Sequence, residues 1–260
     1  SNMDENSLTQ IDKKDLPIEF HSLANSINSL TNRIETYVKF KKELFIGAAH
    51  ELKTPLAVMK LKNEVTLKKK REIEQYEDTL KLTIKQIDDM NIMISSILDI
   101  GRTEGAQFEQ NTELDLVEYI KKKANDYRML SARKNIIITF FSNVNHLNTS
   151  IRVTLFNQIL QNFVQNAIKF TPNEKSIAIR LRKTKDEIII TVTDEGIGIN
   201  EDIDLFAPFK RIGNQSGVGL GLFLAKNAAD ALRAKITLVN RDDDKTGCIA
   251  KLVLNHTSKV

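Results

Sequence analysis

Apolar residues recur with helical spacing through roughly the first hundred residues of the chain. In the first part they alternate in steps of four and three, which is the narrow stripe of a coiled coil. The stripe consists of Leu16, Phe20, Leu23, Ile27, Leu30, Ile34 and Tyr37. Because so narrow a stripe buries little on one helix, it favours a second helix as partner; the alternative is an ordinary amphipathic helix lying on its own domain.

A basic segment, residues 67–71, interrupts the helical pattern, and we interpret it as the turn of a helical hairpin. A second apolar stripe runs from Ile73 to Leu98. This helix is expected to end near Gly101, since glycine suits a C-cap position. Two antiparallel helices per chain, doubled by a dimer, make a four-helix bundle.

After Gly105 the pattern changes to a mixture of strands and helices. Helices are predicted over residues 116–131, 151–170 and 220–232, and strands over 136–141, 177–182, 188–193, 235–239 and 248–254. Lys185-Asp186 between two of these strands indicates a hairpin. The protein is therefore expected to be multi-domain, with an all-α hairpin followed by an α/β two-layer sandwich whose helices cover one sheet face.

Composition narrows the possible functions only modestly. The chain has 260 residues, of which 41% are hydrophobic, and a net charge of +4, which gives no reason to expect nucleic acid as a partner. Cys248 is the only cysteine, so no disulfide can form within the chain, as suits a reducing compartment. No apolar run approaches the roughly 18 residues that cross a bilayer. Ser1-Asn2-Met3 resembles a scar of tag removal, and we expect a fragment of a longer protein.

His50 is the candidate nucleophile of the helical half. A neutral imidazole nitrogen attacks electrophiles readily, and Glu51 can orient the ring or take its proton. Thr54 is four residues on, hence on the same helix face, where its hydroxyl can position a water molecule. Pro55 is expected to bend the helix just after the histidine. Taken alone, a histidine followed by an acid is more typical of an ordinary helix surface.

The polar side of the predicted helix 151–170 carries two amides and a cation. Asn162 and Asn166 are four residues apart and Lys169 is three further on, so all three share one stripe. Amide oxygens can hold a hard cation and a lysine can meet phosphate oxygens. A solvated face explains the same pattern equally well.

Six of the ten glycines fall between Gly196 and Gly221, directly after an acid, Asp194, at the end of a predicted strand. A carboxylate there can accept a hydrogen bond from an exocyclic amine such as that of adenine. Gly217 to Gly221 precede a helix, whose first N–H groups form an anion site. The stretch contains neither a Walker A loop nor a GxGxxG fingerprint.

Taken in order, these motifs match one family. His50–Pro55 resembles the H-box of bacterial sensor histidine kinases, and Asn162–Asn166 resembles their N-box. Asp194–Gly198 and Gly217–Gly221 resemble the two glycine boxes, and Phe206–Phe209 resembles the F-box. Each motif alone is weak or moderate, whereas the ordered set is highly specific and covers roughly residues 35–255.

The resemblance implies a dimeric histidine-phosphotransfer bundle followed by a Bergerat-type ATP-binding domain. It implies residues 1–34 as a coiled-coil linker, 35–105 as the dimerisation and phosphotransfer domain and 106–260 as the catalytic domain. The expected activity is ATP-dependent phosphorylation of His50, followed by transfer to an aspartate of a response regulator. The fragment is expected in the cytoplasm, with the parent protein anchored in the bacterial inner membrane through its missing N-terminal part.

The resemblance also implies roles for single residues. Glu51 would act as base, Thr54 would serve a phosphatase reaction, Asn166 would bind Mg²⁺ with support from Asn162, and Asp194 would read adenine. The residues expected to complete the ATP site are Lys169, Gly196, Gly198, Phe209, Lys210, Arg211, Gly217, Gly219, Gly221 and Leu222. Two rivals remain open, an ATPase of the same fold without phosphohistidine and a catalytically silent dimeric scaffold.

Overall fold

A computed structural model describes residues 11, 16–106, 108–210, 218–243 and 245–255 of the chain. The chain divides into two compact units, Ser1–Gln86 and Ile87–Val260. None of the described helices has an apolar stretch long enough to cross a membrane. Two predicted site residues, Arg211 and Gly217, lie outside the described residues.

The predicted helical hairpin is confirmed. A short 3-10 turn, η1 (Ile18–Phe20), leads into α1 (His21–Leu67), and α2 (Ile73–Ala106) follows after five residues. The helix α1 continues through Pro55. The predicted end of α2 near Gly101 is wrong, because the helix runs on to Ala106. A glycine inside a helix costs only about 1 kcal/mol, so it does not by itself end one.

Near the turn of the hairpin, threonines join the two helices. The hydroxyls of Thr66 and Thr79 are hydrogen-bonded across the helices at 2.9 Å, and both side chains are buried. One turn further along, the Thr83 hydroxyl donates to the side-chain oxygen of Asn63 at 3.5 Å. These bonds set which turns of the two helices face each other next to the loop.

The second unit is built on a five-stranded sheet. Its strands are β2 (Ile137–Ser142), β4 (Ser176–Lys183), β5 (Glu187–Asp194), β6 (Lys235–Asn240) and β7 (Cys248–Asn255), in the order β2-β4-β5-β7-β6. The strands β2 and β4 are parallel, and the other neighbours are antiparallel. The predicted hairpin at Lys185-Asp186 is therefore confirmed.

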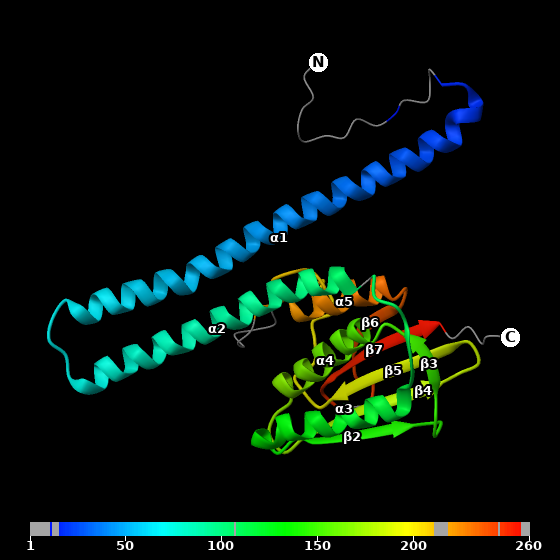
Figure 1. Ribbon diagram of the computed structural model, residues 1–260. Coiled ribbons are helices and arrows are strands. Elements are labelled where there is room, and N and C mark those ends of the chain that lie inside the picture. Colours follow the sequence, from blue (N-terminus) through cyan, green and yellow to red (C-terminus); the bar gives the residue numbers. More distant parts are fainter. Residues whose placement is uncertain (1–10, 12–15, 107, 211–217, 244, 256–260) are drawn as a thin grey trace. The chain divides into compact units, whose positions relative to one another are not determined.

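Three helices cover one face of this sheet, α3 (Leu116–Ser131), α4 (Val153–Phe170) and α5 (Gly221–Ala231) (Figure 1). In β4, β5 and β7 every second residue is buried, because alternate side chains point to the helices. On α4 the matching face is fully apolar. Its buried residues are Leu155, Phe156, Ile159, Leu160, Phe163, Val164 and Ala167.

One small sheet was not predicted. The strands β1 (Thr112–Asp115) and β3 (Asn148–Ile151) pair antiparallel, so residue 151, expected to begin a helix, ends a strand instead. Four-residue strands are too short to show a periodicity of two above chance. The β1 strand ends at Asp115, whose carboxylate accepts hydrogen bonds from the N–H groups of Val117 and Glu118 and so caps α3.

Candidate functional site

A pocket with a volume of about 340 Å³ lies beside α4, the end of β5 and the start of α5. Nine of the predicted site residues line it, namely Asn162, Asn166, Lys169, Asp194, Gly198, Lys210, Gly219, Gly221 and Leu222. They come from four separate stretches of the chain, so the fold brings together residues that were selected from sequence motifs. The volume lies in the range typical of small-molecule sites.

The polar stripe of α4 faces this pocket. Asn162, Asn166 and Lys169 are all half-buried, opposite the buried apolar face of the helix. The Lys169 ammonium lies 4.8 Å from the centre of the Phe170 ring, a cation–π contact that holds the cation at the end of the helix. A stripe lining a pocket differs from the fully solvated face that the sequence left as an alternative.

The Asn162 side chain also lies close to Gly221, at the end of the glycine-rich segment. Its side-chain N–H donates to the carbonyl of Gln158 at 2.8 Å, which fixes the amide within its own helix. A Cβ atom added at Gly221 would lie 2.6 Å from the Asn162 side-chain oxygen. A side chain at position 221 would therefore require the Asn162 amide to shift away from the first turn of α5.

Asp194 is the buried carboxylate of the pocket, with 7% of its surface exposed. It continues the inward-facing row of β5 after Ile188, Ile190 and Val192. Its Oδ1 atom accepts hydrogen bonds from the N–H of Gly196 at 2.8 Å and the N–H of Cys248 at 3.1 Å. Among the described residues no donor bonds Oδ2, so this oxygen can serve a ligand in the pocket.

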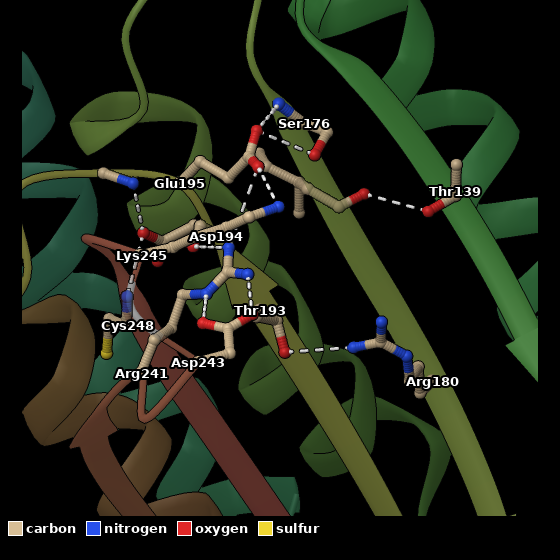
Figure 2. Close-up of polar contacts among 12 residues, drawn as sticks. Thr139, Ser176, Arg180, Thr193, Asp194, Glu195, Arg241, Asp243, Lys245 and Cys248 are labelled. Carbon is tan, nitrogen blue, oxygen red and sulfur yellow. Dashed lines mark hydrogen bonds and ion pairs between the residues drawn. The ribbon is translucent and has the colours of Figure 1, made fainter.

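The electrostatic environment of Asp194 is mixed. Burial raises the pKa of the Asp194 carboxyl above its usual value, whereas the two N–H groups and the charge of Arg241 act in the opposite direction. Figure 2 shows Arg241 beside Asp194, together with Glu195 and Ser176. The sequence motifs did not reveal Arg241, since a single arginine in a polar loop has no signature.

Two other predicted residues, Gly196 and Phe209, do not line the pocket. Gly196 does not line the pocket itself but holds Asp194 through its N–H. Phe209 also lies off the pocket wall and has a left-handed φ of 61°, which is strained for an aromatic residue. Sequence reasoning missed the apolar wall, which includes Phe163, Val192, Leu220, Leu238, Cys248 and Ala250. The strands predicted over residues 188–193 and 248–254 were the signal that could have indicated part of it, because alternate residues of a strand share one face.

His50 lies on α1 in the first unit, with its side chain exposed. The Thr54 hydroxyl donates to the backbone carbonyl of His50 at 3.3 Å, one helical turn away. Thr54 is itself exposed and Glu51 is half-buried. The predicted sharing of one helix face by His50 and Thr54 is thus present, and the imidazole is open to a reacting partner.

The donor groups of the pocket fit Mg²⁺ only with help from a ligand. Among the described residues there is no group of three or more His, Cys, Asp or Glu side chains placed to hold a metal ion. The Asn166 amide oxygen is a hard donor on the pocket wall. Because Mg²⁺ commonly takes one or two protein ligands and completes its shell with phosphate and water, this set suits a nucleotide-borne ion.

Two family models match the chain. Residues 40–106 match the His Kinase A (phospho-acceptor) domain, and residues 152–257 match the histidine kinase-, DNA gyrase B- and HSP90-like ATPase. The first match contains His50, and the second contains the α4, β5 and α5 walls of the pocket.

Curated relatives cover both matched regions. The sensor protein CiaH of Streptococcus pneumoniae is 25% identical over 228 residues, covering 84% of this chain and 51% of that protein. The signal transduction histidine-protein kinase ArlS of Staphylococcus aureus is 27% identical over 219 residues, covering 80% and 48%. The chain thus spans about half the length of the curated relatives it matches.

Solved structures show the same fold. The catalytic domain of histidine kinase ThkA is 26% identical, with a TM-score of 0.51 over 56% of this chain and 96% of that one. ThkA in complex with the response regulator protein TrrA is 21% identical, with a TM-score of 0.68 over 85% of this chain and 64% of that one. The second likeness supports the fold of the hairpin and the sheet domain.

Proposed function

Since this chain belongs to the two-component sensor histidine kinases, we propose that it transfers the γ-phosphoryl group of ATP to His50 and then to an aspartate of a response regulator. The observation that carries the proposal is the pocket in which Asn166, Lys169 and Asp194 converge, on a chain that also bears an exposed histidine in a phospho-acceptor domain.

In this proposal the pocket binds both ends of the nucleotide, the adenine base and the phosphates. The Oδ2 atom of Asp194 accepts a hydrogen bond from the adenine amine, and the apolar wall packs against the ring. Lys169 and Lys210, which line the pocket, neutralise phosphate charge, and Arg211 is expected to act with them. Asn166 would hold Mg²⁺ with support from Asn162, and the ion would supply further charge neutralisation on the phosphates.

The transfer step needs an imidazole nitrogen in line with the γ-phosphorus. A bond forms from this nitrogen to phosphorus while the bond to the β-phosphate oxygen breaks, and ADP leaves. Glu51, next to His50 in the chain, accepts the ring proton. Such transfer depends mainly on alignment and charge neutralisation. The exposed position of His50 supports this step, since an exposed ring is open to a nucleotide held by a separate unit.

Several further features belong to the same proposal. The protein acts as a homodimer through its hairpin, and Thr54 serves a phosphatase reaction on the response regulator. Residues 1–34 form the signal-transmitting linker, 35–105 the phosphotransfer domain and 106–260 the catalytic domain. The fragment works in the cytoplasm, and the parent protein is anchored in the inner membrane.

The test is labelling with γ-labelled ATP alongside measurement of nucleotide binding. We expect His50→Gln to abolish acid-labile labelling while leaving ADP affinity unchanged, and Asn166→Ala to abolish labelling through the nucleotide site. His21→Gln, on the same helix, is the matched control and should be labelled normally. Undiminished labelling of His50→Gln would exclude His50 as the acceptor.

The same experiment separates the two rivals. An ATPase without phosphohistidine releases phosphate but leaves the wild-type protein unlabelled. A silent scaffold binds no nucleotide at all.

A further inference from the structure

A polar network lies at the end of β5 (Figure 2). Its centre is Arg241, the residue after β6, whose side chain is only 10% exposed. The Arg241 guanidinium donates from Nη1 to the backbone carbonyl of Asp194 at 3.2 Å. It also donates from Nε and Nη2 to both carboxylate oxygens of Asp243, the Nε bond being 2.8 Å long. Arg241 is therefore held in one orientation against Asp194.

The backbone around this contact leaves no space for a side chain at position 247. Gly247, which precedes β7, has a φ of 140°, and an added Cβ atom would lie 2.1 Å from the Asp194 carbonyl oxygen and 2.8 Å from Cδ of Arg241. The Arg241 N–H donates to the Gly247 carbonyl at 3.1 Å. The backbone N–H of the next residue, Cys248, donates a hydrogen bond to the Asp194 carboxylate. The connection between β6 and β7, together with Cys248, thus contacts both the backbone carbonyl and the carboxylate of Asp194.

We propose that Arg241, from outside the pocket, is the positioning residue that orients the Asp194 carboxylate for nucleotide binding. The inference rests on the proposed function, since it assigns a role within the same nucleotide site. Arg241 does not line the pocket and need not touch the ligand. It acts by fixing the backbone from which the carboxylate projects and by placing a positive charge beside it.

The charged and titratable groups around Asp194 come from several elements. Glu195 accepts hydrogen bonds from the N–H and hydroxyl of Ser176, both at 2.9 Å, and lies 3.8 Å from the Lys245 ammonium. Burial raises the pKa of the Cys248 thiol to about 12, so the thiol is neutral near pH 7. Asp243 is held by Arg241. Among these groups, the charge that lowers the pKa of the Asp194 carboxyl is that of Arg241.

This arrangement predicts a pH dependence with a definite sign. Burial already raises the pKa of Asp194, and loss of the Arg241 charge raises it further. A protonated carboxyl no longer accepts freely from an adenine amine, so binding weakens as pH falls through the higher value. The affinity deficit of a neutral variant must therefore grow towards acid pH. A purely structural role for Arg241 would produce the same deficit at every pH.

The experiment measures the dissociation constant of ADP for the full chain between pH 5.5 and 8. We expect Arg241→Gln to weaken ADP binding about tenfold at pH 8, with the ratio to wild type growing further towards pH 5.5. Lys245→Gln is the matched control, because it removes a cation from the same connection that contacts Glu195 but not Asp194. Its ratio to wild type should stay near one at each pH.

A second variant keeps the test decisive if Arg241→Gln does not fold. Arg241→Lys retains the charge but loses the planar fork that spans Asp243 and the Asp194 carbonyl, so ADP affinity should fall a few-fold, equally at each pH.

Wild-type affinity in either folded variant, or a deficit of Arg241→Gln that is constant with pH, overturns the inference. A wild-type chain that binds no ADP overturns the proposed function together with it, which distinguishes the two failures.

Discussion

The two regions of the molecule treat their apolar residues in opposite ways. In the sheet unit, Leu155, Phe156 and Ile159 on α4 have no exposed surface. On α1, by contrast, Leu30 is 56% exposed and Ile34 is 53% exposed. The sheet unit carries a complete core of its own, whereas the stripe on α1 is left uncovered within a single chain. A region with that much uncovered apolar surface is typical of one half of an interface.

The candidate chemistry follows the same division. Asp194 is buried among hydrogen-bond donors, which suits its proposed role, because a carboxylate that binds a base is most effective when it is fixed and shielded from water. His50 is exposed, which suits its proposed role, because a phosphoryl acceptor has to be accessible to its reaction partners. Three variants test the contrast between a sheet unit with its own core and a helical hairpin with an exposed apolar stripe.

The largest expected effect comes from the core of the sheet unit. Phe156→Ala should destabilise this unit by about 3–5 kcal/mol, because the side chain is fully buried and the cavity cannot collapse completely. Hydrogen exchange of the β5 amides reports this loss. Phe45→Ala, at a phenylalanine of α1 that is 61% exposed, is the control and should leave β5 exchange unchanged. Equal effects of the two variants would contradict the contrast.

The next effect concerns the stripe on α1. In the proposed dimer, the double variant Leu30→Asp and Ile34→Asp should raise the dissociation constant of the dimer at least about a hundredfold, close to 2.7 kcal/mol, because carboxylates would face each other across the seam. Sedimentation measures the constant. ADP affinity should not change.

Asn25→Asp adds one negative charge at an exposed position off the stripe and should leave dimerisation intact. A double variant that associates as tightly as wild type would indicate that the stripe packs elsewhere.

The smallest of the three effects concerns a cation at the end of α4. The Lys134 ammonium donates to the carbonyls of Ile168 at 2.8 Å, Lys169 at 2.9 Å and Thr171 at 3.3 Å. These are carbonyls of the last turn and the C-cap, where positive charge is favoured. Lys134→Met should therefore destabilise the sheet unit by about 1–2 kcal/mol.

Hydrogen exchange along α4 measures this loss. Lys122→Met, at an exposed lysine of α3, is its control and should have no measurable effect. Unchanged exchange at the end of α4 in Lys134→Met would show that water replaces the ammonium without cost.

Sequence patterns predicted most of the elements for a physical reason. The helix over residues 116–131 and the hairpin at Lys185-Asp186 are confirmed, because long periodic runs bounded by turn residues carry a strong local signal. The end of α2 was wrong, and the strands β1 and β3 were missed. Helix ends depend on small differences in free energy, and four-residue strands exist only because a partner pairs with them.

The candidate site divides in the same way. Asn162, Asn166, Asp194 and the glycines were selected from motifs, and the fold places them on one pocket. No motif indicated Arg241 or Cys248, since their relation to Asp194 depends on how β5, β6 and β7 pair. Their assignment came only from contacts between residues about fifty positions apart in the chain.

The order of amino acids alone was enough to predict the division into a helical hairpin and a sheet domain, the family resemblance and the residue types available for chemistry. These properties are written in local periodicity and in short motifs. The three-dimensional fold was needed to show that Asp194 is buried, that Gly221 lies against the Asn162 side chain and that Arg241 donates a hydrogen bond to the Asp194 carbonyl. Burial and hydrogen bonding are properties of neighbours in space, and neighbours in space are set by strand pairing and helix packing.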